Sequence, residues 1–481
     1  MENLPLQALQ AYPPYNNAQL YQKLQDALLR LNKKIIVLDD DPTGVQTVHD
    51  VSVYTNWQND TMLQAFLEPG ALIFIMTNSR SFTAQQTQEA HAEMAQAILY
   101  ASAQTGKDFL IISRSDSTLR GHYPLETQTL KAVLEAAGQP AFDAEVLMPF
   151  FMEGGRYTID NVHYVKQGDA LVPAAQTEFA QDKTFGYQNS HLGLYCQEKT
   201  QGAFLSADMT YISLQSLRGM QTASITQQLC NTTGFQKVIV NAIAYEDVAA
   251  FVLALIDAMG QGKRFLFRTA AALPKVLGNI SNQPLLSANQ LVQKGERNGG
   301  IVVIGSHVQK TTEQFDRLRQ SNLAVEFIEF NQHLVLQPGG LQAQTMHVAQ
   351  QASQAITQGK TAVVYTRRDR FDLDTDDKQK QLEISVQISA AIANIIPNLS
   401  ARPGFIVAKG GITSSDIGVK SLRVKKATVM GQILSGIPVW KTGEESLFPN
   451  MPYVIFPGNV GEADALESIV GKLMENVRNN G

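Results

Sequence analysis

The chain contains a series of short apolar runs that each pass directly into polar residues. Residues 35–38 (IIVL) lead into three aspartates, and residues 71–76 (ALIFIM) and 109–112 (FLII) end in the same abrupt way. An unbroken apolar run of this length predicts a strand that is buried on both faces of a parallel sheet. Helical spacing separates the runs, as at residues 83–106, so the alternation predicts right-handed βαβ units.

The second half of the chain repeats this pattern after a polar interval. Residues 274–300 contain glycine and show only weak periodicity, which is typical of a linker. A length of 481 residues also exceeds one ordinary core. The further apolar runs lie at 145–150, 238–240, 265–267, 301–304, 361–365, 404–408 and 453–456.

These patterns predict an α/β fold made of two α/β domains with mainly parallel sheets and an active-site cleft between the domains. The expected domains are residues 1–273 and 301–481, joined by the linker region 274–300. Residues 168–219 are less regular, and an excursion from the first domain and a dimer contact are both open interpretations. A homodimer is therefore an expected assembly.

Charged and hydroxyl side chains follow the predicted strands of the first half. The carboxyl ends of parallel strands share one edge of a sheet, where ligands of open α/β sheets bind. Arginine presents a planar fork that matches a carboxylate, and hydroxyl groups can bind the alcohols of a sugar, so a pocket for a small polyhydroxy acid is predicted. The residues are Asp40, Asp41, Arg80, Arg114, Asp116, Ser117, Thr118, Arg120, His122 and Arg156.

Each of these signals also has a structural interpretation. Asp-Pro-Thr-Gly after Asp40 is good turn chemistry, so the acidic stretch could be an acidic turn. A single arginine is more often part of a surface ion pair than of a binding site. Several arginines at consecutive strand ends favour the site.

Glycine is frequent where the predicted strands of the second half end. Gly305-Ser306, residues 409–418 (KGGITSSDIG) and residues 457–461 (PGNVG) follow three of them. Glycine lets the backbone approach a phosphate, and the start of a helix favours negative charge, so a nucleotide site is predicted, with glycines that merely end strands as the alternative. There is no Walker A motif and no Rossmann GxGxxG after an opening strand, which disfavours a nicotinamide enzyme.

Composition narrows the classes of partner. A formal net charge of −5 without strong charge blocks argues against binding to nucleic acid. No run approaches ~20 apolar residues and the N-terminus lacks a basic, then apolar, pattern, so neither a membrane span nor secretion is expected. The two cysteines, Cys196 and Cys230, form no CxxC or Cys/His cluster, which suits a reducing cytoplasm.

The motifs resemble those of the four-carbon acid sugar kinases, two-domain enzymes that phosphorylate threonate, erythronate or oxo-tetronate with ATP. The DDxTG loop of that family is similar to residues 40–44, and its DSTLRG motif is matched without change by residues 116–121. The GR pair corresponds to Gly155 and Arg156. In the second half, the resemblance rests on Gly305-Ser306 with Thr311 and Gln314, and on a GGxT turn at residues 410–413.

The resemblance implies an ATP- and Mg²⁺-dependent kinase whose first domain holds the sugar acid and whose second domain holds the nucleotide. One of Asp40, Asp41 and Asp116 is expected to act as the base, with Asp41 favoured. Substrate binding is assigned to Arg80, Arg114, Ser117, Thr118, Arg120 and Arg156, and nucleotide binding to Ser306, Gly410, Gly411, Ile412, Thr413 and Gly458.

The sequence departs from the family pattern in two places. Many members have Lys-Ser-Gly where Phe456, Pro457 and Gly458 stand here, so a lysine near the phosphates is missing from that position. Asp39 and Pro42 replace an alanine and an apolar residue, which indicates a subgroup with a different sugar acid. Two other functions stay open: a non-catalytic sensor of sugar acid and nucleotide, and a dehydrogenase or isomerase of such acids.

Overall fold

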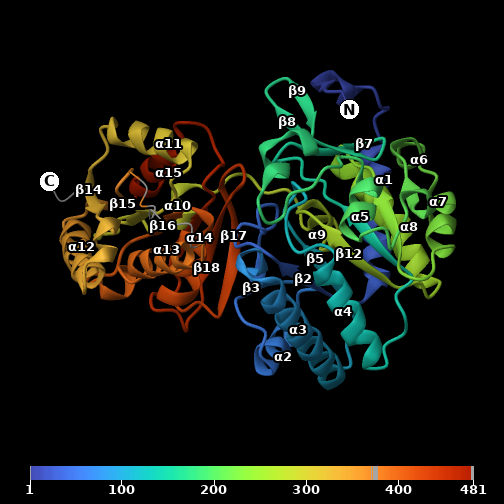
Figure 1. Cartoon of the computed structure of the whole chain (residues 1–481), viewed down its shortest axis with the longest axis horizontal. Helices are drawn as coiled ribbons and strands as arrows, with labels where there is room; N and C mark the ends of the chain where they lie inside the picture. Colours follow the sequence, from blue (N-terminus) through green and yellow to red (C-terminus); the bar gives the residue numbers. More distant parts are fainter. Residues whose placement is uncertain (1, 370, 372–377, 478–481) are drawn as a thin grey trace. The chain divides into compact units, whose positions relative to one another are not determined.

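The computed structural model describes residues 2–369, 371 and 378–477. The chain divides into two compact units, residues 1–47 with 56–281, and residues 48–55 with 282–481 (Figure 1). The predicted α/β class with two domains and mainly parallel sheets is confirmed. Among the described residues, no helix is both long enough and apolar enough to cross a membrane.

The first unit is built on a parallel sheet whose neighbouring strands follow the order β10-β11-β6-β12-β5-β2-β4. All six residues of β2 are buried, as its unbroken apolar run predicts. The strands are β2 (Lys34–Asp39), β4 (Leu72–Met76), β5 (Phe109–Arg114), β6 (Ala144–Met148), β10 (Thr210–Ile212), β11 (Gln236–Val240) and β12 (Phe265–Thr269).

The helices of this unit pack in groups, α3 against both α2 and α4, and α8 against α1, α7, α6 and α9 (Figure 1). Helix α3 begins with a capping box, in which the side chain of Thr83 accepts from Gln86 N and the side chain of Gln86 accepts from Thr83 N, as the Thr-x-x-Gln spacing predicts. The helices are α1 (Asn17–Leu31), α2 (Asn59–Leu67), α3 (Ala84–Thr105), α4 (Leu125–Ala136), α6 (Leu214–Arg218), α7 (Thr222–Cys230), α8 (Tyr245–Gly260) and α9 (Ala272–Leu277).

A small antiparallel sheet accompanies the first unit, in the order β1-β9-β8-β7. Its strands are β1 (Leu4–Pro5), β7 (Arg156–Ile159), β8 (Val162–Gln167) and β9 (Ala170–Pro173). The irregular residues 168–219 supply β9 and α5 (Leu192–Lys199), and Leu192 and Tyr195 share a buried core with Leu119 and Ile239 of the parallel sheet region. This segment is thus an excursion packed into the first unit, while its use in a dimer stays a prediction.

The second unit has a mixed sheet in the order β3-β17-β18-β19-β16-β13-β15-β14. The pairs from β3 to β19 are antiparallel, and those from β19 to β14 are parallel. The strands are β3 (Val51–Tyr54), β13 (Ile301–Ile304), β14 (Val325–Phe330), β15 (Thr361–Thr366), β16 (Ile406–Lys409), β17 (Lys426–Leu434), β18 (Ile437–Thr442) and β19 (Pro452–Phe456). The helices are α10 (Ala288–Leu291), α11 (Gln309–Arg319), α12 (Gly340–Thr357), α13 (Lys378–Ala393), α14 (Gly411–Asp416) and α15 (Ala465–Met474).

The unit boundaries differ from the predicted ranges in two ways. Residues 48–55 leave the first unit because β3 pairs with β17, more than three hundred residues later in the chain. Residues 274–300, the predicted linker region, contain most of α9 and all of α10, and the boundary falls at residue 281. A helix end and a short helix thus occupy a stretch whose composition resembles a loop.

Candidate functional site

The acidic stretch after β2 and the arginine after β4 form one ion-pair network at the carboxyl edge of the first unit's sheet. Because β2 and β4 are neighbouring parallel strands, their following loops meet there. Arg80 grips Asp40 as a fork, with Nη2 2.6 Å from Oδ1 and Nε 3.1 Å from Oδ2, and its Nη1 lies 3.3 Å from Asp41 Oδ2. Burial raises the pKa of Asp40, but the charge and hydrogen bonds of Arg80 together with the charges of Arg114 and Arg268 outweigh burial, so the pKa lies below its usual value.

Asp40 and Asp41 differ in how open they are. Ser115 Oγ donates to Asp40 Oδ2 at 2.7 Å, so both oxygens of this carboxylate are occupied and its side chain is 2% exposed. Asp41 is held by the backbone N–H of Thr43 at 2.7 Å and by the Thr43 hydroxyl, and its side chain is 17% exposed. Asp41 is therefore the carboxylate of this loop that a substrate can reach more readily.

Asp39, the last residue of β2, is a buried carboxylate of another kind. Its Oδ1 lies 3.2 Å from Nη1 of Arg114, and a Cβ added to Gly44 would lie 1.8 Å from its Oδ2. Only glycine at position 44 leaves room for this carboxylate. Burial raises the pKa of Asp39 to about 7, although Arg114 opposes the shift, while Asp40 and Asp41 add to it.

We expect Asp39→Asn to flatten the pH dependence of stability. The folded pKa is about 7 and the ordinary value is 3.8, so across this window the unfolded chain binds fewer protons and stability falls as pH rises. Asparagine does not titrate, so the Tm of the variant minus that of wild type should increase between about pH 5 and pH 8 in calorimetric scans. An equal difference at both pH values would show that Asp39 is ionised in the folded protein.

The loop of residues 116–121 is fixed by groups that bind its backbone carbonyls. His163 Nε2 donates to Ser117 O at 2.7 Å, Tyr187 OH donates to Thr118 O at 2.8 Å, and Tyr195 OH donates to Leu119 O at 2.8 Å. Arg268 Nη2 donates to Arg120 O at 3.4 Å, so four consecutive carbonyls are held. Burial lowers the pKa of His163 to about 4, which keeps the ring neutral, with Nε2 carrying the hydrogen because a carbonyl only accepts.

Asp116 and Arg120 of this loop pair with each other. Arg120 Nε lies 2.7 Å from Asp116 Oδ2, which also accepts from the Thr118 hydroxyl. Burial raises the pKa of Asp116, but Arg80 and Arg120 together hold it well below its usual value. The structure thus places six of the predicted pocket residues in contact or in electrostatic interaction with one another: Asp40, Asp41, Arg80, Arg114, Asp116 and Arg120.

Arg156, the first residue of β7, is a half-buried arginine that has no carboxylate partner among the described residues. Its Cζ lies 5.6 Å from the ring centre of Phe179, and that of Arg120 lies 5.1 Å from the same ring. No ion pair to Arg156 occurs among the described residues, and its Nε is buried without a hydrogen-bond partner. Burial, and then the charge of Arg120, lower its pKa, whereas Asp116 raises it. Such a cation is suited to receive an anionic ligand.

Some predicted members of the pocket have mainly structural contacts. Ser117 and Thr118 are buried, and Thr118 Oγ1 is bonded to Asp116. His122 Nε2 lies 3.0 Å from Phe82 O and its ring packs edge-on against Phe185. His163, Tyr187 and Tyr195 carry no sequence signal for this role, because they come from irregular or antiparallel segments. Arg268, near the end of β12, was not predicted, although the strand-end pattern includes it.

The predicted glycines of the second unit meet at one edge of its sheet. They follow β13, β16 and β19, which are neighbours in the order β19-β16-β13. A Cβ on Gly305 would lie 2.3 Å from Thr413 Oγ1, one on Gly410 would lie 3.1 Å from Ser306 Cβ, and one on Gly458 would lie 2.9 Å from Ser306 Oγ. The three turns therefore touch, and their close approach requires glycine.

Thr311 and Gln314 of α11 tie these turns together. Thr311 Oγ1 donates to Gly458 O at 2.9 Å, and Gln314 Nε2 donates to Val460 O at 3.0 Å and to Glu462 O at 2.9 Å. Gly411 and Ile412 begin α14, and the side chain of Ile412 is 70% exposed beside the turns. Ser306, Gly410, Thr413 and Gly458 thus form one cluster, as expected, in a unit separate from that of the aspartates.

Arg368 is a residue of this cluster that was not predicted. Its Nη1 donates to Ser306 O at 2.9 Å and its Nη2 to Thr312 Oγ1 at 2.6 Å, while its Nε is buried without a hydrogen-bond partner. It follows β15, so the rule that found the arginines of the first unit at strand ends could have found it as well. It adds positive charge beside Ser306.

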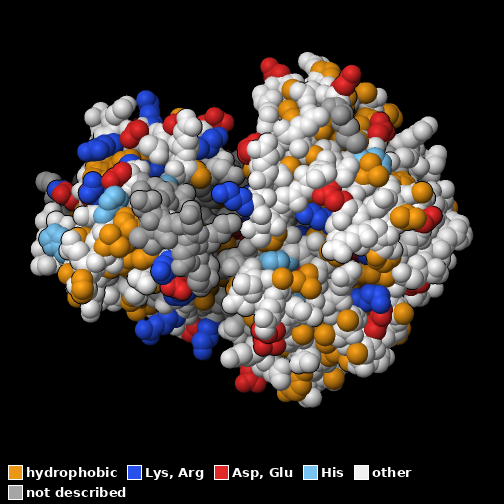
Figure 2. Space-filling model, viewed as in Figure 1, with side chains coloured by type: hydrophobic (Ala, Val, Ile, Leu, Met, Phe, Trp, Pro, Cys, Tyr) orange, Lys and Arg blue, Asp and Glu red, His pale blue; other side chains and the backbone are white. Residues whose placement is uncertain are grey.

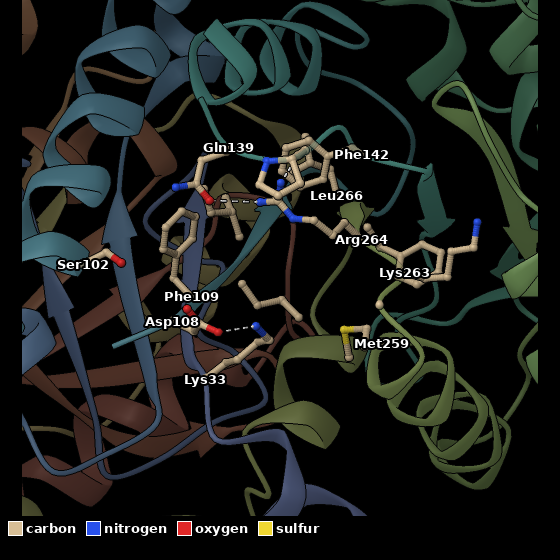
Figure 3. A pocket seen from close by; sticks show the side chains of 15 residues that line it. Lys33, Ser102, Asp108, Phe109, Gln139, Phe142, Met259, Lys263, Arg264 and Leu266 are labelled. Carbon is tan, nitrogen blue, oxygen red and sulfur yellow. Dashed lines mark hydrogen bonds and ion pairs between the residues drawn. The ribbon is translucent and has the colours of Figure 1, made fainter. Parts of the chain in front are cut away.

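A cavity of about 380 Å³ lies elsewhere, at the amino ends of β5 and β12 (Figure 3). Two of its cations are ion-paired, with Lys33 Nζ 3.1 Å from Asp108 Oδ2 and Lys263 Nζ 2.8 Å from Asp143 Oδ1, and the third, Arg264, donates to Pro140 O. None of the predicted site residues lines it. On the face shown in Figure 2, Lys and Arg side chains are interspersed with Asp and Glu and form no continuous basic surface.

Comparisons with known proteins agree with this division of residues. Residues 35–277 match the model of a sugar-binding N-terminal domain, and residues 301–466 match that of a nucleotide-binding C-terminal domain. No curated protein matches the sequence.

Solved structures show the same fold at low identity. A Salmonella typhimurium LT2 protein described as a "putative tRNA synthase" is similar with a TM-score of 0.63 and 16% identity, over 91% of this chain and 98% of that one. Haemophilus influenzae protein HI1011, from the DUF1537 family, is similar with a TM-score of 0.59 and 18% identity, over 91% of this chain and 100% of that one.

The two matched domains follow each other in the order that the motifs predict. The sugar-binding match contains the acidic loop and the loop of residues 116–121, and the nucleotide-binding match contains all three glycine-bearing turns. The chain therefore belongs to the four-carbon acid sugar kinase (DUF1537) family.

Proposed function

We propose that the protein is a kinase that transfers the γ-phosphoryl group of ATP to a hydroxyl of a four-carbon sugar acid of the threonate, erythronate or oxo-tetronate type. The observation that carries the proposal is the pairing of two built sites. An aspartate–arginine network beside the half-buried Arg156, whose Nε has no hydrogen-bond partner, suits a hydroxy acid, and a cluster of glycine-bearing turns around Ser306 suits phosphates.

The roles of the first-unit residues follow from their contacts. We infer that Arg156, with Arg120, binds the carboxylate of the acid, because no described carboxylate forms an ion pair with Arg156. Asp41 is proposed as the group that orients or deprotonates the attacking hydroxyl, because it is more open than Asp40. The pKa of Asp116 is held low, which makes that carboxylate a weaker base. Arg80 and Arg114 keep the aspartates in place.

The second-unit turns fit a nucleotide because Gly305, Gly410 and Gly458 leave backbone free of side chains around Ser306. Mg²⁺ would enter with the nucleotide, since it prefers phosphate oxygens and water over a cage of protein ligands. Among the described residues, no cluster of three or more His, Cys, Asp or Glu side chains could hold a metal ion. We further propose that closure of a cleft between the domains brings the phosphate to the acid and excludes water.

The test is ADP release by purified protein with Mg·ATP and a panel of four-carbon acids, with the phosphate position of the product mapped by NMR. Turnover of one or more acids is expected. Binding of both ligands without turnover of any acid would favour the sensor, and thermal protection by a nicotinamide cofactor but not by ATP would favour the dehydrogenase. A cytoplasmic location, which the free Cys196 and Cys230 suit, and a homodimer complete the proposal.

Arg156→Ala should raise the KM for the sugar acid by about 10- to 100-fold, as expected for a lost charge-assisted hydrogen bond. The Kd for ATP should not change, because Arg156 lies in the first unit. Steady-state kinetics and ATP titration measure the two quantities. The matched control is Arg30→Ala, which removes an exposed arginine of α1 paired with Asp257 and should alter neither. An unchanged KM in Arg156→Ala would contradict this role.

A further inference from the structure

Lys409, the last residue of β16, is a buried lysine in the middle of the cluster of glycine-bearing turns. The residue is 0% exposed, its Nζ donates to Pro457 O at 2.7 Å, and Nζ lies 3.4 Å from Gly458 O and 3.5 Å from the ring centre of Phe456. Among the described residues, no carboxylate forms an ion pair with it. Ionising a buried amine without a counter-ion is costly, so a lysine at this position calls for a reason.

Lys237 shows how the same chain neutralises a buried lysine. Lys237 is also 0% exposed, but its Nζ lies 2.6 Å from Glu145 Oε2. At Lys409 the charged group that shifts the pKa instead has the same sign, because Lys310 of α11 lowers it by repulsion. Among the described residues, no carboxylate thus offsets the charge that Lys409 would carry.

The position of Lys409 ties it to all three turns. Gly410 follows Lys409 directly in the chain, and the carbonyl oxygen of Lys409 accepts from Gly305 N at 3.3 Å. The Nζ of Lys409 contacts the Pro457–Gly458 turn after β19. The residues just before Gly458 in the sequence are Phe456 and Pro457, so this turn has no lysine of its own. One side chain from β16 thus brings positive charge to the turn after β19.

We propose that Lys409 is a positioning residue of the nucleotide site, whose ammonium holds the Pro457–Gly458 turn and supplies positive charge to the bound phosphates. This inference rests on the proposed function, because it requires that the turns bind a nucleotide. The phosphate of a bound nucleotide would provide a counter-ion for this amine.

The environment of Lys409 also predicts how it titrates. Burial, and then the charge of Lys310, lower its pKa to about 6. The other groups that face it, the ring of Phe456 and the carbonyls of Pro457 and Gly458, do not titrate. The side chain is thus largely neutral near pH 7.5, and an anion nearby raises its pKa. Nucleotide binding should therefore take up a proton, and affinity should fall as pH rises through the range above about 6.

The experiment is calorimetric titration of Mg·ATP into the full-length wild type, Lys409→Met, Lys409→Arg and Lys360→Met, in two buffers with different ionisation enthalpies. Lys409→Met should raise the Kd by about 10- to 100-fold and lose the proton uptake of wild type. Lys409→Arg should keep most of the affinity without the uptake, because arginine does not titrate. Lys360→Met removes an exposed lysine at the opposite end of the second unit's parallel strands and should behave as wild type.

Three results separate the possible failures. Wild type that binds no Mg·ATP would contradict the proposed function itself. Wild type that binds it, with Lys409→Met equal in Kd and in proton uptake, would overturn the role of Lys409 alone. If Lys409→Met does not fold, the pH dependence of the Kd of wild type for Mg·ATP decides. This Kd should increase with pH, whereas ionisation of ATP alone would make it decrease. A Kd that decreases with pH would overturn the inference.

Discussion

Gly410→Ala is expected to raise the Kd for Mg·ATP by at least about 100-fold while both units remain folded. Gly410 has φ 121° and ψ 141°, a conformation that is nearly restricted to glycine and costs about 1–3 kcal/mol for other residues. A Cβ there would also lie 3.1 Å from Ser306 Cβ and 3.3 Å from Thr413 Oγ1. The turn must therefore move away from Ser306, and the phosphate site opens. ATP titration measures the loss.

Gly339→Ala is the matched control, because Gly339 lies in the same unit and also has a positive φ, of +73°, but a Cβ there would meet nothing within 4 Å. This variant carries the milder strain of a left-handed residue (φ 73°, ψ −1°) without the steric conflict and should bind ATP as wild type does. Sugar-acid affinity should be unchanged in both. If both glycine variants lose ATP equally, strain in the second unit rather than the local geometry of Gly410 is responsible.

The parallel strands could be predicted because each one is buried on both faces. All residues of β2 and β13 are buried, and the unbroken apolar runs in these strands predict this burial. The loops that follow adjacent parallel strands meet at one edge of the sheet, and for this reason the sequence predicts that Arg80 and Asp40 lie close together.

The antiparallel part of the second unit was not predicted because its signal is different. β17 alternates between buried and exposed or half-buried residues, so it contains no apolar run. β3 is only four residues long, and nothing in its local sequence indicates that its partner is β17. A pairing between such distant segments depends on the whole fold, and the unit boundary at residues 48–55 follows from it.

The side chains that hold the loop of residues 116–121 could not be predicted from the sequence for a related reason. The motif at residues 116–121 is visible in the sequence, but the side chains that hold its carbonyls come from β8, α5 and the loop before it. His163, Tyr187 and Tyr195 carry no local sign of this task, since a buried histidine or tyrosine is ordinary core. Sequence patterns show which groups can react, and the tertiary structure shows which groups hold them.

Asp41→Asn is expected to lower kcat by about 10²- to 10⁴-fold while both ligands still bind. Asparagine keeps an oxygen that can accept from Thr43, and the fork of Arg80 on Asp40 does not depend on residue 41. The loop should therefore keep its shape and lose only the carboxylate. Steady-state kinetics, with separate titrations of ATP and of the sugar acid, distinguish chemistry from binding.

Two further variants define what Asp41 contributes. Asp26→Asn removes an exposed carboxylate from α1 and should leave kcat unchanged. Asp40→Asn breaks a buried fork with Arg80, so it should lower Tm as well as activity, whereas Asp41→Asn should affect mainly kcat. Near-normal turnover in Asp41→Asn would remove it as the base. The acceptor proton would then have to leave through Asp116, whose pKa Arg80 and Arg120 depress against the effect of burial, and Asp116→Asn should in that case carry the loss in kcat.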